Sequence, residues 1–171
     1  MAEQHRIFIS KINAARVNGL RSFLRASWWE TYQAELGQDL TKRLVETLAS
    51  EDIGGLLPCN GETAFVAEHQ DSVCGCCMSA SRKNVTYLWG LYVLRDFQKM
   101  GLGQRLLRDA ILEHDRANSA QLTVLKSSTE AVQFYKAMCF KTQCETQFEI
   151  LPGLLLPAIQ MSARAYEITR K

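Results

Sequence analysis

The chain has 171 residues, a formal net charge of +2 and a hydrophobic fraction of 47%. These values are typical of one globular domain over residues 1–171, and they exclude a disordered or low-complexity chain. Twenty Lys and Arg against eighteen Asp and Glu give no support for a basic surface that binds the phosphate backbone of nucleic acid. We therefore expect no nucleic-acid partner.

Neither a membrane span nor a secretory signal is predicted. The longest apolar runs, such as Gly153–Ile159, are far shorter than the roughly 18 residues that a membrane span needs. The first residues, MAEQHRIFIS, contain no basic region followed by an apolar stretch. We therefore expect a cytoplasmic protein without membrane contact, whose six cysteines stay reduced.

The first quarter of the chain is predicted to hold one strand and two helices. Arg6–Ile12 alternates apolar and polar residues, which is typical of a strand. Apolar residues at steps of three and four predict an amphipathic helix from Ala14 to about Leu36, with a break considered near Ser27, and a second helix over Gln38–Leu48. A loop rich in glycine follows.

The middle of the chain is predicted to be a meander of three strands joined by short polar turns. The strands are Thr63–Glu68, Val73–Ala80 and Val85–Leu94. The last of them is apolar almost without interruption over Tyr87–Leu94, which indicates a central strand buried on both faces.

The second half alternates helices and strands. Apolar residues at helical spacing predict a helix that begins directly after Gly101 and Gly103 and reaches His114. Gln121–Leu125 is predicted to be a short buried strand, and Thr129–Met138 a helix. A last pair of strands is predicted over Thr142–Ile150 and Pro157–Ala163. The order of elements predicts a mixed sheet with helices on its faces and one parallel crossover.

The segment Leu91–Leu107 carries the clearest signal for chemistry. A predicted strand ends in a loop with Gly101 and Gly103, and a helix begins at once. Glycines let a ligand approach the backbone closely, and a helix start presents unpaired N–H groups and a positive dipole end. This arrangement predicts a cradle for phosphate or pyrophosphate, with Lys99 and Arg105 adding attraction. A tight turn that serves only helix–strand packing is the alternative.

Two familiar phosphate-binding motifs do not fit this segment. A Rossmann fingerprint needs a small residue where Leu106 stands. A P-loop needs Lys and then Ser or Thr after its last glycine, whereas Gln104 and Arg105 follow Gly103.

The loop and two further segments resemble one known family. Gln98–Gly103, with the sequence QKMGLG, resembles the Q/R-x-x-G-x-G/A pyrophosphate loop of the GCN5-related N-acetyltransferase (GNAT) family. Ser128–Phe140 resembles the family's N-x-x-A-x-x-F-Y-x-x-x-G-F segment, and Ser27–Tyr32 is similar to its S-W-x-x-T-Y stretch. The resemblance covers nearly the whole chain. It implies a GNAT-like acyl-CoA N-acyltransferase fold, an α/β fold with a splayed, mostly antiparallel sheet flanked by helices.

The resemblance implies that the cofactor is acetyl-coenzyme A (acetyl-CoA). The pantetheine arm would bond to the backbone of the central strand, and the pyrophosphate would lie on the glycine loop. The residues implied in cofactor binding are Leu91, Tyr92, Val93, Gln98, Lys99, Met100, Gly101, Leu102, Gly103, Gln104, Ser128, Ala131 and Tyr135.

Tyr135 is implied as the catalytic acid. An ordinary tyrosine, with a pKa of about 10, is protonated at neutral pH and can give its proton to the departing thiolate of coenzyme A. A base must also take the ammonium proton. Many family members carry a carboxylate where this chain has Trp89 and Gly90. The possible bases are therefore Glu62 and Glu68, with His69 as a further candidate, and any of them could instead be a solvated turn residue.

Two further positions depart from the family pattern. Ser128 stands where the family has Asn, which shortens the reach of a hydrogen-bonding group. Cys139 replaces a Gly at a helix end that favours positive φ, so a side chain must be tolerated there.

Aromatic residues and cysteines allow more than one interpretation. Trp28, Tyr32 and Trp89 are predicted either to pack in the core or to line the pocket of the acceptor substrate, where they would favour an apolar or cationic group. The Cys74–Cys77 cluster lacks a usual zinc spacing, so we interpret its thiols as packing residues and predict no metal.

The sequence therefore predicts an enzyme that moves an acetyl group from acetyl-CoA to a primary amine, of a small molecule or a peptide, by direct attack in a ternary complex. The alternative is a non-catalytic acyl-CoA-binding or regulatory module, suggested by the missing carboxylate at Trp89 and Gly90. Either a monomer or a homodimer is compatible with the sequence.

Overall fold

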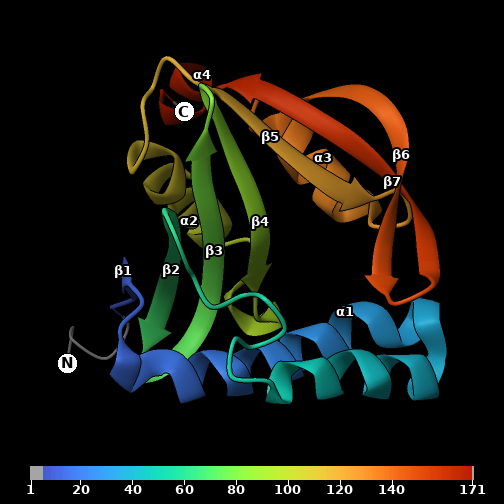
Figure 1. The fold of residues 1–171 in the computed structure, drawn as a ribbon. Coiled ribbons are helices and arrows are strands. Elements are labelled where there is room, and N and C mark those ends of the chain that lie inside the picture. The colour runs from blue at the N-terminus through green and yellow to red at the C-terminus, as the bar shows by residue number, and fades with distance from the viewer. Residues whose placement is uncertain (1–5, 171) are drawn as a thin grey trace. The chain divides into compact units, whose positions relative to one another are not determined.

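The computed structural model describes residues 6–170. In chain order the strands are β1 (Phe8–Lys11), β2 (Glu62–His69), β3 (Ser72–Arg82), β4 (Val85–Val93), β5 (Ser119–Leu125), β6 (Lys141–Leu151) and β7 (Leu154–Arg164). The α-helices are α1 (Val17–Glu46), α2 (Leu102–Leu112), α3 (Thr129–Ala137) and α4 (Ala165–Thr169), and single 3-10 turns cover Ala14–Arg16, Thr47–Ala49 and Arg95–Phe97 (Figure 1).

The sheet has seven strands in the order β1-β2-β3-β4-β5-β7-β6. Pairing is antiparallel between β1 and β2, between β5 and β7, and between β6 and β7, and it is parallel between β4 and β5. The parallel ladder joins Val85–Tyr87 to Ser119–Gln121. The predicted α/β fold with a mixed, mostly antiparallel sheet and flanking helices is therefore confirmed.

The chain divides into two compact units. Unit 1 comprises Met1–Met78 and Gly90–Leu107, and unit 2 comprises Ser79–Trp89 and Arg108–Lys171. The strands β3 and β4 and the helix α2 each contribute residues to both.

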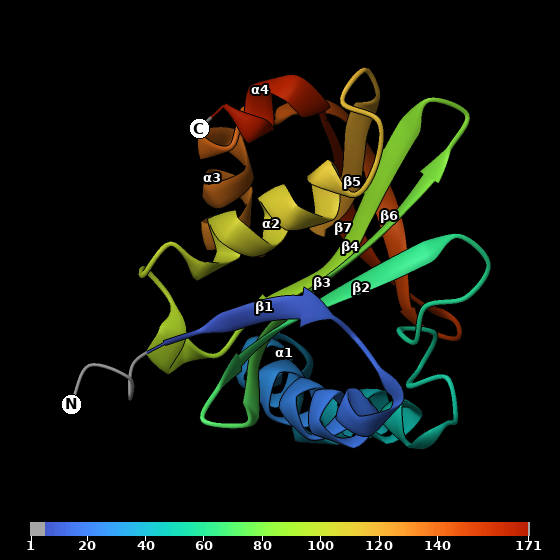
Figure 2. The ribbon, with the colours of Figure 1, turned by 90° about the vertical axis from the view of Figure 1, so that its left-hand side faces the viewer.

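In unit 1, α1 covers one face of the strands (Figure 2). The helix buries Leu20, Leu24 and Leu44, which follow the predicted helical period. Its direction changes at Gly37, where φ is +75°, and not near Ser27, which lies buried within a continuous helical stretch. The change occurs at Gly37 because only a residue without a Cβ adopts this conformation at little cost.

In unit 2, β5, β7 and β6 form an antiparallel sheet with α3 on one side (Figure 2). The strand β7 starts at Leu154, three residues before the predicted Pro157, because the β6–β7 hairpin continues to a turn at Gly153, where φ is +79°. The short helix α4 has no counterpart in the sequence prediction.

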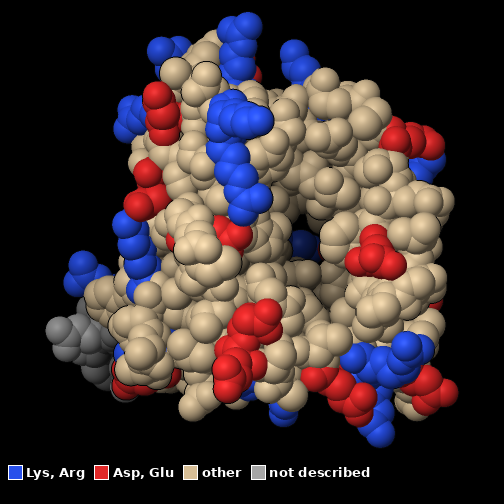
Figure 3. Space-filling view, in the orientation of Figure 1, with Lys and Arg blue, Asp and Glu red and all other residues tan. Residues whose placement is uncertain are grey.

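Charges of both signs share the face of the molecule drawn in Figure 3, and neither sign covers that face alone. This distribution agrees with the small net charge of +2. Over residues 6–170, no helix combines the length and the apolar character that a membrane span requires.

Candidate functional site

The loop from β4 to α2 in unit 1 is held by hydrogen bonds at its beginning. The Leu94 N–H donates to the Cys74 carbonyl at 3.0 Å, and the Phe97 N–H donates to the Leu94 carbonyl at 2.8 Å. The Gln98 side chain turns back, and its Nε2 donates to the Val93 carbonyl at 2.9 Å. Gln98 therefore fixes the end of β4 relative to the loop.

The loop then takes a conformation that exposes backbone at the start of α2. Lys99 has a φ of +60° and Gly101 a φ of +77°, and both are exposed. The first helical bond runs from the Arg105 N–H to the Gly101 carbonyl at 3.1 Å, so the N–H groups just before Arg105 have no acceptor within the helix. Such N–H groups and the positive end of a helix are the features that the predicted anion cradle requires.

Packing does not explain Gly101. A Cβ built on Gly101 would meet no atom within 4 Å, so its methyl group would project into open space. The close contact between helix and strand depends on a different glycine, Gly75 of β3, where a Cβ would lie 2.9 Å from Leu106 Cδ1. The alternative in which the loop glycine serves only helix–strand packing is thus disfavoured for Gly101.

The other loop residues divide into core and surface. Leu102 is only 2% exposed, so its side chain anchors α2 and only its backbone can face a ligand. Met100 is 65% exposed, Gln104 is exposed and Gly103 is half-buried. Leu91, Tyr92 and Val93 at the end of β4 are half-buried.

An aromatic cluster in unit 1 joins α1 to the end of β4. The hydroxyls of Tyr32 and Tyr92 are hydrogen-bonded at 2.9 Å. The Trp28 ring lies 6.4 Å from the Tyr32 ring and 6.3 Å from the Tyr92 ring, centre to centre. From the sequence, Tyr92 is expected to bind the cofactor through its backbone only, and the contact of its side chain with Tyr32 was not predicted.

The protonation of Tyr32 follows from this environment. Burial raises the pKa of Tyr32 above its ordinary value, the hydrogen bond with Tyr92 acts in the opposite direction, and the charge of Glu35 adds to the increase. Tyr32 therefore remains protonated at neutral pH, which excludes it as a general base there.

The two candidate carboxylate bases in β2 have different surroundings. Glu68 Oε1 lies 2.8 Å from Arg16 Nε, and the Glu68 side chain is only 14% exposed. Glu62 lies at the other end of β2, where its Oε2 accepts a hydrogen bond from the Cys59 N–H at 3.2 Å and contacts the Cys59 thiol at 3.5 Å. Glu68 thus forms an ion pair with a guanidinium, whereas the Glu62 carboxylate contacts the backbone and the thiol of Cys59.

Tyr135 lies in α3 of unit 2 and is half-buried. Its ring packs edge-on against Phe134, with centroids 5.3 Å apart, and against Phe140, with centroids 5.6 Å apart. These contacts fix the ring by apolar packing, which a Phe ring could equally make. Ser128 is the N-cap residue of α3 but makes no side-chain cap bond, and Ala131 is half-buried. Trp89, also in unit 2, is half-buried.

Cys139 terminates α3 in a left-handed conformation, with a φ of +72°. The Phe140 N–H donates to the Tyr135 carbonyl at 3.0 Å and the Cys139 N–H to the Lys136 carbonyl at 3.1 Å, which is the Schellman pattern. The position normally occupied by Gly therefore keeps its geometry with a side chain present.

We expect Cys139→Gly to raise the free energy of unfolding by about 1 kcal/mol, because it removes a left-handed strain of roughly 1–2 kcal/mol and adds a smaller backbone-entropy cost. Urea denaturation measures the change. Cys139→Ala is the matched control and should give no gain, because alanine keeps the Cβ. Equal stability of the Gly and Ala variants would contradict the strain at this position.

The cysteines are free thiols in the structure. Cys74, Cys76 and Cys77 are buried, and burial raises the pKa of Cys74 to about 11 and that of Cys77 to about 12. This burial supports their interpretation as packing residues. Within residues 6–170, no three His, Cys, Asp or Glu side chains are grouped so that they could hold a metal ion.

Solved structures with a similar fold include N-acetyltransferases. The PaiA N-acetyltransferase from Thermoplasma acidophilum, solved in complex with coenzyme A, has a TM-score of 0.76 and 18% identity over 93% of this chain and 99% of that one. The ribosomal-protein-S18-alanine N-acetyltransferase from Escherichia coli has a TM-score of 0.65 and 16% identity over 92% of each chain. A chimera of the spermidine N-acetyltransferase SpeG from Vibrio cholerae and hSSAT has a TM-score of 0.65 and 15% identity over 96% of this chain and 99% of that one.

These similarities define the class of the fold, which is that of the GNAT acyltransferases. Residues 60–142 match the family model described as an acetyltransferase (GNAT) domain. The predicted resemblance is confirmed, because these residues match a GNAT acetyltransferase domain and the fold is that of GNAT acetyltransferases. No curated protein matches the sequence significantly.

Proposed function

We propose that this protein transfers an acetyl group from acetyl-CoA to a primary amine by direct attack within a ternary complex. The observation that carries the proposal is the exposed cradle at the start of α2, where Gly101 faces open space. Backbone donors can hold a pyrophosphate there without a large positive charge. This agrees with the small net charge of the chain.

The residues that would hold the cofactor belong to two groups. In unit 1, the backbone of Leu91–Val93 would bind the pantetheine arm and the backbone of Lys99–Gln104 the pyrophosphate. In unit 2, the proposed contacts come from Ser128, Ala131 and Tyr135. When bound, acetyl-CoA supplies the thioester that an amine attacks.

The proposed chemistry requires one acid and one base. We assign the acid to the Tyr135 hydroxyl, which would pass a proton to the departing sulfur. Of the two carboxylates in β2, we assign the base to Glu62, because Glu68 Oε1 is already paired with Arg16 Nε at 2.8 Å.

Solved relatives of the same fold support a primary amine as the acceptor. They include an acetyltransferase of a ribosomal-protein alanine and one of spermidine. A peptide amine and a small-molecule amine are therefore both retained as acceptor classes. The aromatic cluster of Trp28, Tyr32 and Tyr92 is proposed to favour an acceptor with apolar or cationic parts. We further propose a cytoplasmic monomer or homodimer.

A panel of amines tests the function. The protein is mixed with acetyl-CoA and, in separate reactions, with polyamines, amino acids and short peptides with free N-termini, and the release of coenzyme A is measured. We expect release above the hydrolysis background with at least one amine class. Binding of acetyl-CoA without release for any amine would favour the non-catalytic alternative, and absence of binding would contradict both.

A further inference from the structure

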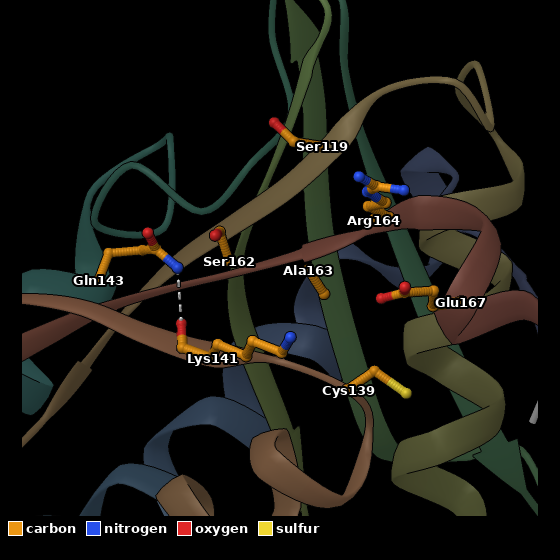
Figure 4. A pocket seen from close by; sticks show the side chains of 8 residues that line it. All are labelled: Ser119, Cys139, Lys141, Gln143, Ser162, Ala163, Arg164 and Glu167. Atoms are coloured by element: carbon orange, nitrogen blue, oxygen red, sulfur yellow. Dashed lines mark hydrogen bonds between the residues drawn. The ribbon is translucent and has the colours of Figure 1, made fainter.

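Unit 2 contains a cavity that none of the proposed cofactor, acid or base residues lines. Its volume is about 430 Å³, within the usual range for small-molecule sites. Polar and charged side chains form most of the wall, among them Ser119, Cys139, Lys141, Ser162, Arg164 and Glu167 (Figure 4).

Strand register brings these residues together from four separate segments. Ser119 of β5 pairs with Arg164 of β7, and Ser162 of β7 pairs with Lys141 of β6. Residues two apart on a strand share a face, so Ser162 and Arg164 point to the same side. The left-handed end of α3 places Cys139 just before β6, and α4 contributes Glu167 directly after β7.

Three of the wall side chains turn toward one region. Figure 4 shows Lys141, Cys139 and Glu167 turned toward the same region beside Ala163, with Arg164 and Ser119 above it. The Gln143 Nε2 donates to the Lys141 carbonyl at 3.3 Å, which fixes the neighbouring backbone. The cavity thus has a defined polar wall.

The charges of this wall are only partly compensated. Within the described residues 6–170, Lys141 forms no ion pair. Arg164 Nη1 donates to the Tyr166 hydroxyl at 3.0 Å, and this bond, with the charges of Tyr166 and Glu167, raises the pKa of Arg164 further above its ordinary value. The wall therefore contains two cationic side chains, Lys141 and Arg164, and one carboxylate, Glu167.

We propose that this cavity binds a small acidic amino acid, a ligand with two carboxylates and one ammonium group. Such a ligand is the charge complement of the wall: its carboxylates meet Lys141 and Arg164, and its ammonium group meets Glu167. The hydroxyls of Ser119 and Ser162 supply further hydrogen bonds to carboxylate oxygens. The site is separate in its residues from the proposed transfer chemistry.

Binding of L-glutamate to the full chain, measured by calorimetry without acetyl-CoA, tests the proposal independently of the proposed function. We expect saturable binding, weakened about tenfold or more by Lys141→Gln or Arg164→Gln, because each removes a charge-assisted hydrogen bond. Lys136→Gln, which removes an exposed charge of the same unit outside this cavity, is the matched control and should bind as the unaltered protein does.

A second comparison distinguishes a specific binding site from a general attraction of anions by the positive side chains. Glutarate has both carboxylates but no ammonium group, so the unaltered protein should bind it about tenfold more weakly than glutamate, and Glu167→Gln should largely remove this difference. Failure of glutamate to saturate, equal binding by the Lys141 and Lys136 variants, or a preference for glutamate that survives Glu167→Gln would each overturn the proposal.

Discussion

Tyr135→Phe is expected to lower kcat by about 100-fold or more while the affinity for acetyl-CoA stays nearly unchanged. The variant removes one oxygen, which is the proposed proton donor to the departing sulfur. The ring packing should survive, because Tyr135 contacts Phe134 and Phe140 through its ring. Steady-state kinetics of coenzyme A release, together with equilibrium binding of acetyl-CoA, measures the two effects separately.

Tyr87→Phe is the control for this experiment. Tyr87 lies in β4 of the same unit, is 40% exposed and has no proposed part in binding or transfer, so loss of its hydroxyl should leave kcat unchanged. A Tyr135 variant with the kcat of the unaltered protein would reject the assigned acid. An equal loss in both variants would point to a general effect on unit 2 instead.

Most of the fold could be predicted because its elements repeat apolar residues with clear periods. The continuous apolar run in β4 and the helical stripe of α2 each lie within one or two residues of the predicted bounds. The helix α4 was missed because its five residues, Ala165–Thr169, are too short to display a period. The change of direction at Gly37 agrees with the predicted boundary between two helices, whereas a break near Ser27 was wrong.

The loop could be predicted as an anion cradle because its determinants are local. The left-handed conformation of Gly101 and the start of α2 both lie within a few residues of sequence. The side-chain pairs could not be predicted, since they join distant segments. The Tyr32 and Tyr92 hydroxyls are 60 positions apart, and Glu68 pairs with Arg16 of the turn before α1. No periodic pattern specifies which side chains meet across a sheet and a helix.

The cavity of unit 2 illustrates the same limit more strongly. Lys141, Arg164 and Glu167 come from β6, β7 and α4, and each is an ordinary surface charge when considered alone. Lys141 comes to the same cavity as Arg164 only through the register of β6 on β7, which places Lys141 opposite Ser162. The one sequence signal near the cavity was the replacement of Gly by Cys139, which indicated strain but no ligand.

Gly101→Val is expected to weaken acetyl-CoA binding by at least about tenfold, equivalent to about 1.4 kcal/mol. At Gly101 the added side chain would project into open space at the start of α2, where the pyrophosphate is proposed to lie. Loss of even one charge-assisted hydrogen bond is worth about 1.5–3 kcal/mol, so a tenfold effect is a lower bound. Calorimetric titration with acetyl-CoA measures it.

Backbone strain must be separated from the loss of the cradle, because valine is disfavoured at a φ of +77°. Gly61→Val provides the control: Gly61 belongs to the same unit, has a φ of +82° and also has no atom within 4 Å of a built Cβ. Both variants should lose similar stability in urea denaturation, but only Gly101→Val should lose affinity. The two substitutions introduce similar backbone strain and both project into open space, so they differ mainly in position. A loss of affinity in Gly101→Val alone would support a pyrophosphate site at the start of α2. Equal affinities of the two variants would contradict that assignment.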